Sequence, residues 1–163
     1  MRTRILHRWK TVCLGGLLGI SSLCAQAEGT GYTPATENLQ ARKEFQDGKF
    51  GIFLHWGIYS MFGQGEWYMN TDNIDCHEYA KAASGFYPSR FNAHEWVAAI
   101  KASGAKYICI TSRHHDGFSM FDTKYSDYDI VDATPFKRDV IKELAEECRK
   151  QGIRLHLYYS HLD

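Results

Sequence analysis

The residues best suited to chemistry are two adjacent histidines, His114 and His115, which directly follow the apolar run 107–111. A short run of β-branched and aromatic residues that ends in a polar cluster is typical of a buried parallel strand. In α/β folds, ligands bind at the carboxyl ends of such strands. Imidazoles placed there can hydrogen-bond a ligand or bind a metal. The structural alternative is that one histidine caps the strand while its neighbour faces water.

Two other segments predicted to be strands end in side chains of similar kinds. The stretch 49–55 ends at His55, and the stretch 153–159 ends at Tyr158 and Tyr159. If the three strands lie side by side and parallel, their carboxyl ends open onto one face. We therefore expect these side chains to lie near the histidine pair.

The loop after the first predicted strand adds a carboxylate and an indole, Glu66 and Trp67. It is long and aromatic, has no sustained periodicity over 58–70, and follows a strand, which is where functional loops are common. The alternative for Glu66 is a solvated surface carboxylate.

A sugar site fits this mixture of residues better than a metal site. Hydrogen bonds to several hydroxyls need compact donors and acceptors, and an aromatic plate suits the C–H face of a sugar ring. A metal-dependent hydrolase using His55, His114 and His115 is the rival interpretation, because imidazoles suit zinc. The His-x-His pattern of metal-binding barrels is absent, since Phe53 stands two residues before His55. We therefore expect neither a metal nor a cofactor.

Several neighbouring side chains are expected to support the site rather than to touch a ligand. Arg113 and Asp116 are suited to a structural ion pair or to bracing the histidine loop. Tyr68 and Trp96 are expected to pack, and for Trp56 packing and ligand contact are equally open.

The elements around these residues alternate between helix and strand. Helices are predicted over 37–46, from Asn92 to Gly104 and over 139–150, and strands over 49–55, 106–111 and 153–159. This alternation predicts a parallel α/β sheet with right-handed crossovers. Three strands do not close a barrel, so the last strand is expected to be an exposed apolar edge.

The first 27 residues are predicted to be a secretory signal peptide. Four basic residues precede the apolar segment 12–23, and Ala25-Gln26-Ala27 fits a cleavage site. The apolar segment is too short to span a bilayer, so no stable membrane anchor is expected. Cys24 leaves lipid attachment as the less favoured alternative, because the residue before it is the bulky Leu23.

The mature chain, predicted as residues 28–163, is mildly acidic. Removing four basic residues from a chain with 19 basic and 19 acidic residues leaves a net charge of −4, which excludes a nucleic-acid-binding footprint. The remaining cysteines, Cys76, Cys109 and Cys148, have no disulfide or metal-knuckle spacing. Oligomeric state is left open.

Four segments together resemble the α-L-fucosidases of glycoside hydrolase family 29. They are 50–57 with His-Trp-Gly, 65–68 with Gly-Glu-Trp-Tyr, 105–118 with His-His-Asp-Gly-Phe, and Tyr158-Tyr159-Ser160. The resemblance covers roughly residues 38 to 163. It implies the N-terminal part, about three βα units, of a (β/α)8-type catalytic barrel that removes terminal α-L-fucose with retention.

The resemblance also implies roles for single residues. The family's fucose-binding residues match His55, Glu66, Trp67, His114, His115 and Tyr158. Tyr159 is the alternative to Tyr158, because strand alternation turns only one of them inward.

The family's catalytic pair has no counterpart in this sequence. The nucleophilic aspartate follows a fourth strand and the acid/base lies further on, whereas retaining hydrolysis needs both carboxyl groups. We therefore expect an exported fragment, periplasmic or secreted, that recognises fucosylated glycans and is inactive by itself. The alternative is a non-catalytic sugar-binding remnant.

Overall fold

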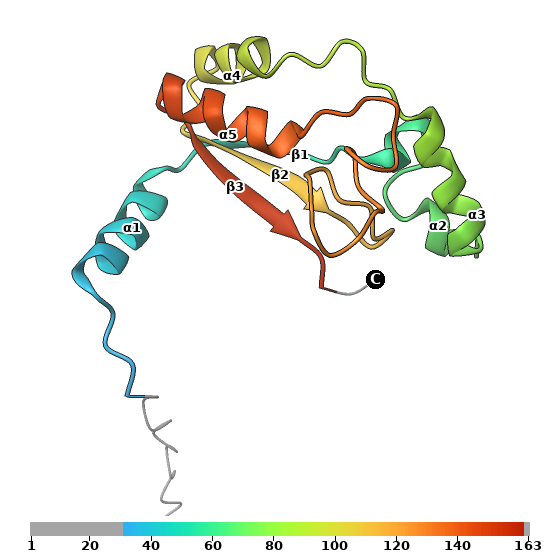
Figure 1. Ribbon diagram of the computed structural model, residues 1–163. Helices are drawn as coiled ribbons and strands as arrows, with labels where there is room; N and C mark the ends of the chain where they lie inside the picture. The colour runs from blue at the N-terminus through green and yellow to red at the C-terminus, as the bar shows by residue number, and fades with distance from the viewer. Residues whose placement is uncertain (1–30, 162–163) are drawn as a thin grey trace, which may run out of the picture. The chain divides into compact units, whose positions relative to one another are not determined.

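Three parallel strands, β1 (Gly51–Leu54), β2 (Tyr107–Arg113) and β3 (Arg154–Tyr159), form one sheet in the order β1-β2-β3 (Figure 1). In this computed structural model, residues 31–161 are described. Two units are distinguished, Met1–Pro34 and Ala35–Asp163, and the sheet belongs to the second. The predicted boundary between residues 27 and 28, together with the predicted signal peptide, lies outside the described residues.

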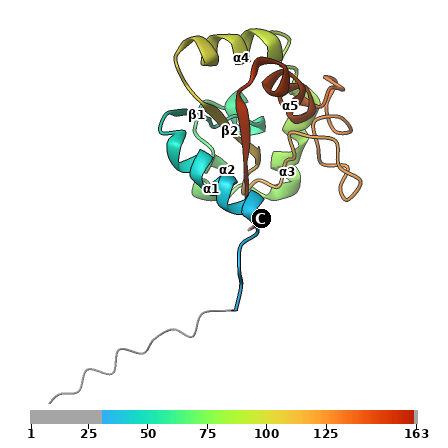
Figure 2. The same cartoon turned by 90° about the vertical axis from the view of Figure 1, so that its left-hand side faces the viewer.

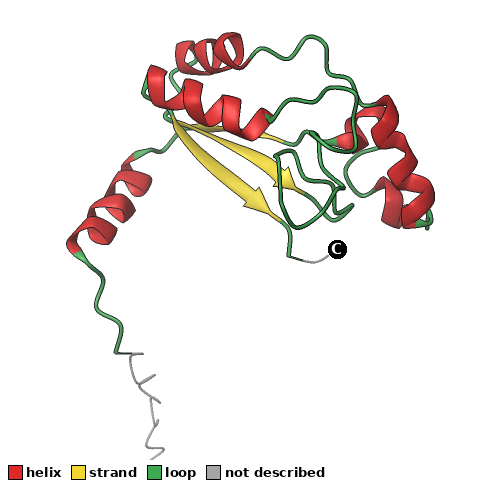
Figure 3. Cartoon of the chain, viewed as in Figure 1, coloured by secondary structure: helices red, strands yellow, loops and turns green. Residues whose placement is uncertain are grey.

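Helices occupy much of the rest of the second unit (Figure 3). The longer ones are α1 (Thr36–Asp47), α4 (Ala93–Ala102) and α5 (Val140–Gln151), close to the three predicted ranges. Four short helices between β1 and α4 were not predicted: η1 (Ile58–Met61), α2 (Tyr68–Thr71), α3 (Cys76–Ala80) and η2 (Lys81–Gly85). They have four or five residues each, too few to show a helical period in the sequence.

The two crossover helices begin at side-chain caps. Asn92 Oδ1 accepts a hydrogen bond from the Glu95 amide at 3.2 Å, and Asp139 Oδ1 accepts one from the Lys142 amide at 2.8 Å. Such caps satisfy backbone N–H groups that have no partner within the helix. At its other end α5 stops at Gly152, whose φ of 73° is in the left-handed region.

Helices α4 and α5 lie on the same side of the sheet in both views of the molecule (Figures 1 and 2). Their apolar residues Val97 and Leu144, together with Ile108 and Ile110 of β2, are fully buried in one core cluster. Burying branched apolar side chains of this size stabilises a fold by about 1.5–3 kcal/mol each. This layer fixes the orientation of β2.

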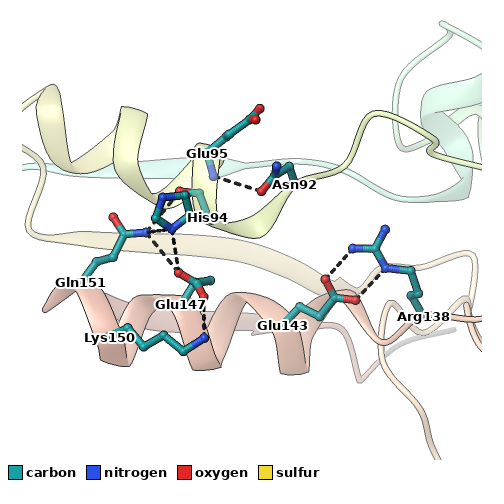
Figure 4. Close-up of polar contacts among 8 residues, drawn as sticks. All are labelled: Asn92, His94, Glu95, Arg138, Glu143, Glu147, Lys150 and Gln151. Carbon is teal, nitrogen blue, oxygen red and sulfur yellow. Dashed lines mark hydrogen bonds and ion pairs between the residues drawn. The ribbon is translucent and has the colours of Figure 1, made fainter.

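Polar contacts join the exposed surfaces of the same two helices (Figure 4). His94 Nδ1 lies 3.2 Å from Glu147 Oε2, and Gln151 donates to the His94 carbonyl at 3.1 Å. Glu147 also pairs with Lys150 at 2.6 Å. The hydrogen bonds from Lys150, His94 and Gln151 lower the pKa of the Glu147 carboxyl to about 2. Glu147 is therefore ionised throughout the neutral range.

The opposite face of the sheet carries aromatic rings. Tyr107 stacks on His156 with centroids 4.6 Å apart, and Phe45 of α1 stacks on the same imidazole at 5.6 Å. Strand β3 is an edge of the sheet, and its Leu157 is 54% exposed. An apolar edge at β3 is what the sequence predicted.

The cysteines and the helices of the described residues were examined for disulfide bonds and for membrane spans. Cys76, Cys109 and Cys148 are free thiols, and Cys148 is buried. Among residues 31–161, no helix has the length and apolar character needed to cross a bilayer.

Gly51 provides a test of this sheet face. A Cβ at residue 51 would lie 2.2 Å from Cζ of Tyr107, whose ring is held against His156. We expect Gly51→Ala to lower the free energy of unfolding by about 1–3 kcal/mol, the usual effect of overpacking. Denaturant unfolding measures the change.

A double-mutant cycle separates this clash from other effects of the substitution. In a Tyr107→Ala background the same Gly51→Ala change should be nearly neutral. Gly85→Ala, where no atom lies within 4 Å of the added Cβ, is the matched control. An equal loss of stability with and without the Tyr107 ring would show that the clash is not the cause.

Candidate sugar-binding site

The carboxyl ends of β1 and β2 are joined by one buried hydroxyl group, that of Thr111. Thr111 Oγ1 accepts a hydrogen bond from the Trp56 amide at 3.0 Å and donates to the Trp56 carbonyl at 3.1 Å. The Tyr59 hydroxyl, 2.8 Å away, then donates to the same oxygen. Burial raises the pKa of Tyr59 to about 12, so this phenol stays protonated. The backbone next to His55 is thereby fixed relative to β2.

Three histidines that follow β1 and β2 and one tyrosine of β3 meet beside this junction. The His114 ring centroid lies 5.5 Å from that of His55 and 4.5 Å from that of His115. Tyr158 of β3 stacks on His114, with centroids 5.5 Å apart and an interplanar angle of 19°. The parallel register positions these residues, since Leu54 pairs with Ile110 and Thr111 pairs with Tyr158.

The loop after β1 brings Glu66 and Trp67 to the same cluster. Trp67 packs on His115 at 4.3 Å and stands perpendicular to His114 at 6.0 Å, yet remains 48% exposed. One carboxylate oxygen of Glu66 and one ring nitrogen each of His55 and His114 lie within 4.8 Å of one another. The structure therefore brings together all six residues that the sequence singled out.

Side-chain alternation along β3 decides which tyrosine faces the cluster. The register of β2 with β3 shifts between Thr111 and Arg113, so Tyr158 pairs with Thr111 and Tyr159 with Arg113. Tyr159 is half-exposed, and the Arg113 guanidinium lies 5.8 Å from its ring centroid. Tyr158 is thus the tyrosine on the histidine side, and Tyr159 lies elsewhere.

The loop that carries the histidine pair is stabilised by Asp116. Its Oδ1 accepts a hydrogen bond from the Phe118 amide at 3.2 Å, and the Gly117 amide donates to the His114 carbonyl at 3.0 Å. Gly117 has a φ of 73°, a conformation that favours glycine. Burial raises the pKa of Asp116 to about 6. Asp116 therefore braces the loop, as the sequence predicted.

The electrostatics of the site keep its central imidazole neutral. His114 is only 4% exposed, and burial, followed by the nearby His115 and His55, lowers its pKa to about 4. Glu66 opposes this shift. At neutral pH the ring therefore offers one donor and one acceptor, which suits a hydroxyl group.

Three side chains of this cluster could also serve as metal ligands, which is the rival interpretation. His55, Glu66 and His114 are of the types that bind zinc, and their spacing is compatible with a common ion. The predicted metal set contained His115 in place of Glu66, so the geometry differs from that prediction. A second acidic group, Asp122, Asp129 and Asp132, differs in kind, because the Asp129 carboxylate accepts hydrogen bonds from the backbone of its own loop.

Trp56 has a supporting role. Tyr59 and Thr111, which the sequence analysis did not identify, also support the site. Trp56 packs against Trp96 at 4.9 Å and Phe91 at 5.5 Å, so core packing is its role here. Tyr59 lies 5.7 Å from His114 and binds Thr111. In the sequence, threonine and tyrosine near a strand look like ordinary β-formers, and no local signal identifies the hydrogen bond between them.

The pKa of His114 generates a test. Because the folded chain keeps this ring neutral while the unfolded chain protonates it near the ordinary pKa of 6.5, its stabilising contribution falls as pH drops from about 6.5 toward 4. Asp116, whose pKa is raised, acts in the opposite direction. The difference in free energy of unfolding between wild type and His114→Asn isolates the histidine. As the pH falls over this range, we expect the wild type to lose stability relative to His114→Asn. A difference that does not change with pH would contradict the lowered pKa of His114.

Comparison with known proteins places these residues in a family. Residues 20–163 match the family model described as Alpha-L-fucosidase. The chain is 36% identical over 160 residues to the plasma alpha-L-fucosidase of Homo sapiens, covering 84% of this chain and 34% of that protein. It thus spans about a third of the length of that curated relative.

Solved structures agree with this assignment. The alpha-L-fucosidase from Vibrio sp. strain EJY3 superposes with a TM-score of 0.72 at 37% identity, over 76% of this chain and 23% of that one. The family 29 alpha-L-fucosidase from Bacteroides thetaiotaomicron superposes with a TM-score of 0.73 at 33% sequence identity, over 76% of this chain and 30% of that one. Alpha-L-fucosidase AlfC, solved in complex with Fuca(1,6)GlcNAc, superposes with a TM-score of 0.71 at 40% sequence identity, over 74% of this chain and 41% of that one. The chain belongs to the α-L-fucosidase family of glycoside hydrolases.

Proposed function

We propose that this chain is the fucose-recognising N-terminal part of an exported α-L-fucosidase. The observation that carries the proposal is the convergence of six side chains from four separate segments at one end of the sheet. They are His55, Glu66, Trp67, His114, His115 and Tyr158. Family membership and a relative solved with Fuca(1,6)GlcNAc support a fucosylated glycan as the ligand.

The chemistry of the cluster suits a monosaccharide. The carboxylate of Glu66 offers only acceptors, whereas the neutral His114 offers a donor and an acceptor. The half-exposed Trp67 presents an apolar face next to these polar groups, which suits the C–H face of a sugar. A ring with several hydroxyls and one apolar face can satisfy both kinds of surface together.

Hydrolysis is proposed to need residues outside this chain. Retaining glycosidases use two carboxyl groups about 5–5.5 Å apart. In the described part of the chain, Glu66 is the carboxylate with an oxygen within 4.8 Å of ring nitrogens of both His55 and His114. We propose that the three strands are part of a (β/α)8 barrel whose further strands supply the nucleophile and the acid/base.

This proposal predicts binding without turnover. The 163-residue chain, incubated with an aryl α-L-fucoside, should release phenol no faster than buffer does. Release that saturates with substrate and disappears in His114→Asn would show instead that the chain contains a complete catalytic site.

The primary test of the proposed function is a calorimetric titration with L-fucose and with its mirror image, D-fucose. We expect only L-fucose to bind, and Glu66→Gln to weaken that binding about 10–100-fold, because hydrogen bonds to a charged group contribute about 1.5–3 kcal/mol. Glutamine keeps the size of the side chain and removes the charge.

The control is Glu78→Gln on α3, an exposed glutamate that pairs with Lys81 at 2.6 Å. It should leave the dissociation constant unchanged. A chelator present throughout should also leave it unchanged, whereas loss of binding with the chelator would favour the metal interpretation. Equal effects of the two glutamate substitutions would remove Glu66 from the site.

Export is proposed from the N-terminal sequence alone. Basic residues before an apolar segment, followed by Ala25-Gln26-Ala27, are typical of a cleaved signal peptide. N-terminal sequencing of the protein from a bacterial periplasm or culture medium should begin at Glu28. A retained Met1, or a lipid on Cys24, would contradict cleavage at this position.

A further inference from the structure

Two imidazoles and a carboxylate meet closely at the carboxyl ends of β1 and β2. One ring nitrogen each of His55 and His114 and one carboxylate oxygen of Glu66 lie within 4.8 Å of one another. Two histidines and a glutamate are a donor set that zinc uses, with a fourth position left open. The ligand atoms of a tetrahedral zinc ion lie about 3.4 Å apart, because each is about 2.0–2.2 Å from the metal. Shifts of at most about 1.5 Å therefore bring these three atoms to the spacing of a zinc site.

The three side chains differ in their freedom to make such shifts. His114 is 4% exposed, stacks on Tyr158 with an interplanar angle of 19°, and stands perpendicular to Trp67 at 6.0 Å. Its ring is therefore held in place. His55 is exposed, and Glu66 is half-buried in the loop after β1. These two side chains can close on an ion that the fixed imidazole holds.

An unpartnered ring nitrogen also points to a ligand at His114. Its Nδ1 is buried and has no hydrogen-bond partner among residues 31–161. A buried polar atom without a partner is costly, so a bound group that contacts it is favoured. A ring nitrogen that carries no proton can bind a metal ion as well as accept a hydrogen bond. This observation is independent of the spacing of the three ligand atoms.

We propose that His55, Glu66 and His114 bind one Zn²⁺ ion and that this ion excludes fucose from the cluster. A sugar hydroxyl that bonds two of these side chains has to lie between atoms within 4.8 Å of one another, which is where the ion lies. The ion is thus a competitor for the site and not a cofactor of hydrolysis. The competition rests on the proposed fucose-binding function, whereas zinc binding itself does not.

The first test is a calorimetric titration of the metal-free, untagged chain with zinc chloride. We expect one ion to bind per chain. His55→Asn and Glu66→Gln should each weaken zinc binding at least about tenfold, because loss of even an outer partner of a bound metal costs about 10–100-fold in affinity. Neither side chain is buried, so neither substitution opens a cavity in the core.

Two matched variants control for binding elsewhere on the chain. His77→Asn removes an exposed histidine next to Cys76, and Asp132→Asn removes an exposed carboxylate of the acidic group. Both variants should bind zinc as the wild type does. A wild type that does not bind zinc would overturn the proposal. Zinc binding that is kept in His55→Asn and Glu66→Gln but lost in either control would overturn it as well.

The second test is a titration with L-fucose in the presence of zinc. At a zinc concentration ten times its Kd, the apparent Kd for L-fucose should rise about tenfold, as mass action requires for two ligands of one site. Mg²⁺ at the same concentration is the control and should have no effect, because it prefers oxygen ligands. An affinity for L-fucose that is unchanged at saturating zinc would refute the competition.

The two titrations separate failure of this inference from failure of the proposed function. If the wild-type chain does not bind L-fucose, the proposed function is wrong, yet the zinc titration still decides whether the three side chains form a metal site. If the wild type binds L-fucose and not zinc, the inference alone is wrong.

Discussion

The parallel pairing of β2 with both of its neighbours is the constraint on which the whole site depends. It brings the carboxyl ends of three strands to one side, so that residues far apart in sequence become neighbours. The Thr111 hydroxyl then locks the ends of β1 and β2 together through both backbone groups of Trp56. This register is what brings His55 and Tyr158 next to His114.

Burial of the polar cluster gives the site its chemical character. The core beneath β2 fixes the strand, and the bulge at its end leaves His114 buried beside two other imidazoles. Burial penalises the charged form of the His114 ring, and the nearby His115 and His55 lower its pKa further, so the neutral form prevails. The result is a neutral His114 imidazole beside the Glu66 carboxylate, and together these groups can donate to and accept from hydroxyl groups.

Much of this arrangement could be predicted because its signals are local. Caps at Asn92 and Asp139 and the apolar run before His114 determine helices and a strand from short stretches of sequence. Grouping the polar residues at strand ends followed from parallel topology alone. Resemblance to a family added two further predictions, that the ligand is fucose and that Tyr158 contacts it.

What the sequence did not reveal depends on contacts between distant residues. The bulge beside Ser112 arises from the pairing of two strands, and the hydroxyl bonds of Thr111 and Ser160 join segments some 45 to 55 residues apart. The helices α2 and α3 are too short to have a period, and tertiary packing decides their conformation. No pattern within one segment encodes these features.

The central claim is that the histidine cluster binds fucose, and mapping the ligand by NMR tests it most directly. Titration of the chain, labelled with ¹⁵N in its histidine side chains, with L-fucose should shift the signals of His55, His114 and His115. These shifts should saturate together, and D-fucose should leave them unchanged. Absence of shifts at saturating L-fucose, or shifts confined to His77, His94 and His156, would contradict a fucose site at the carboxyl ends of the strands.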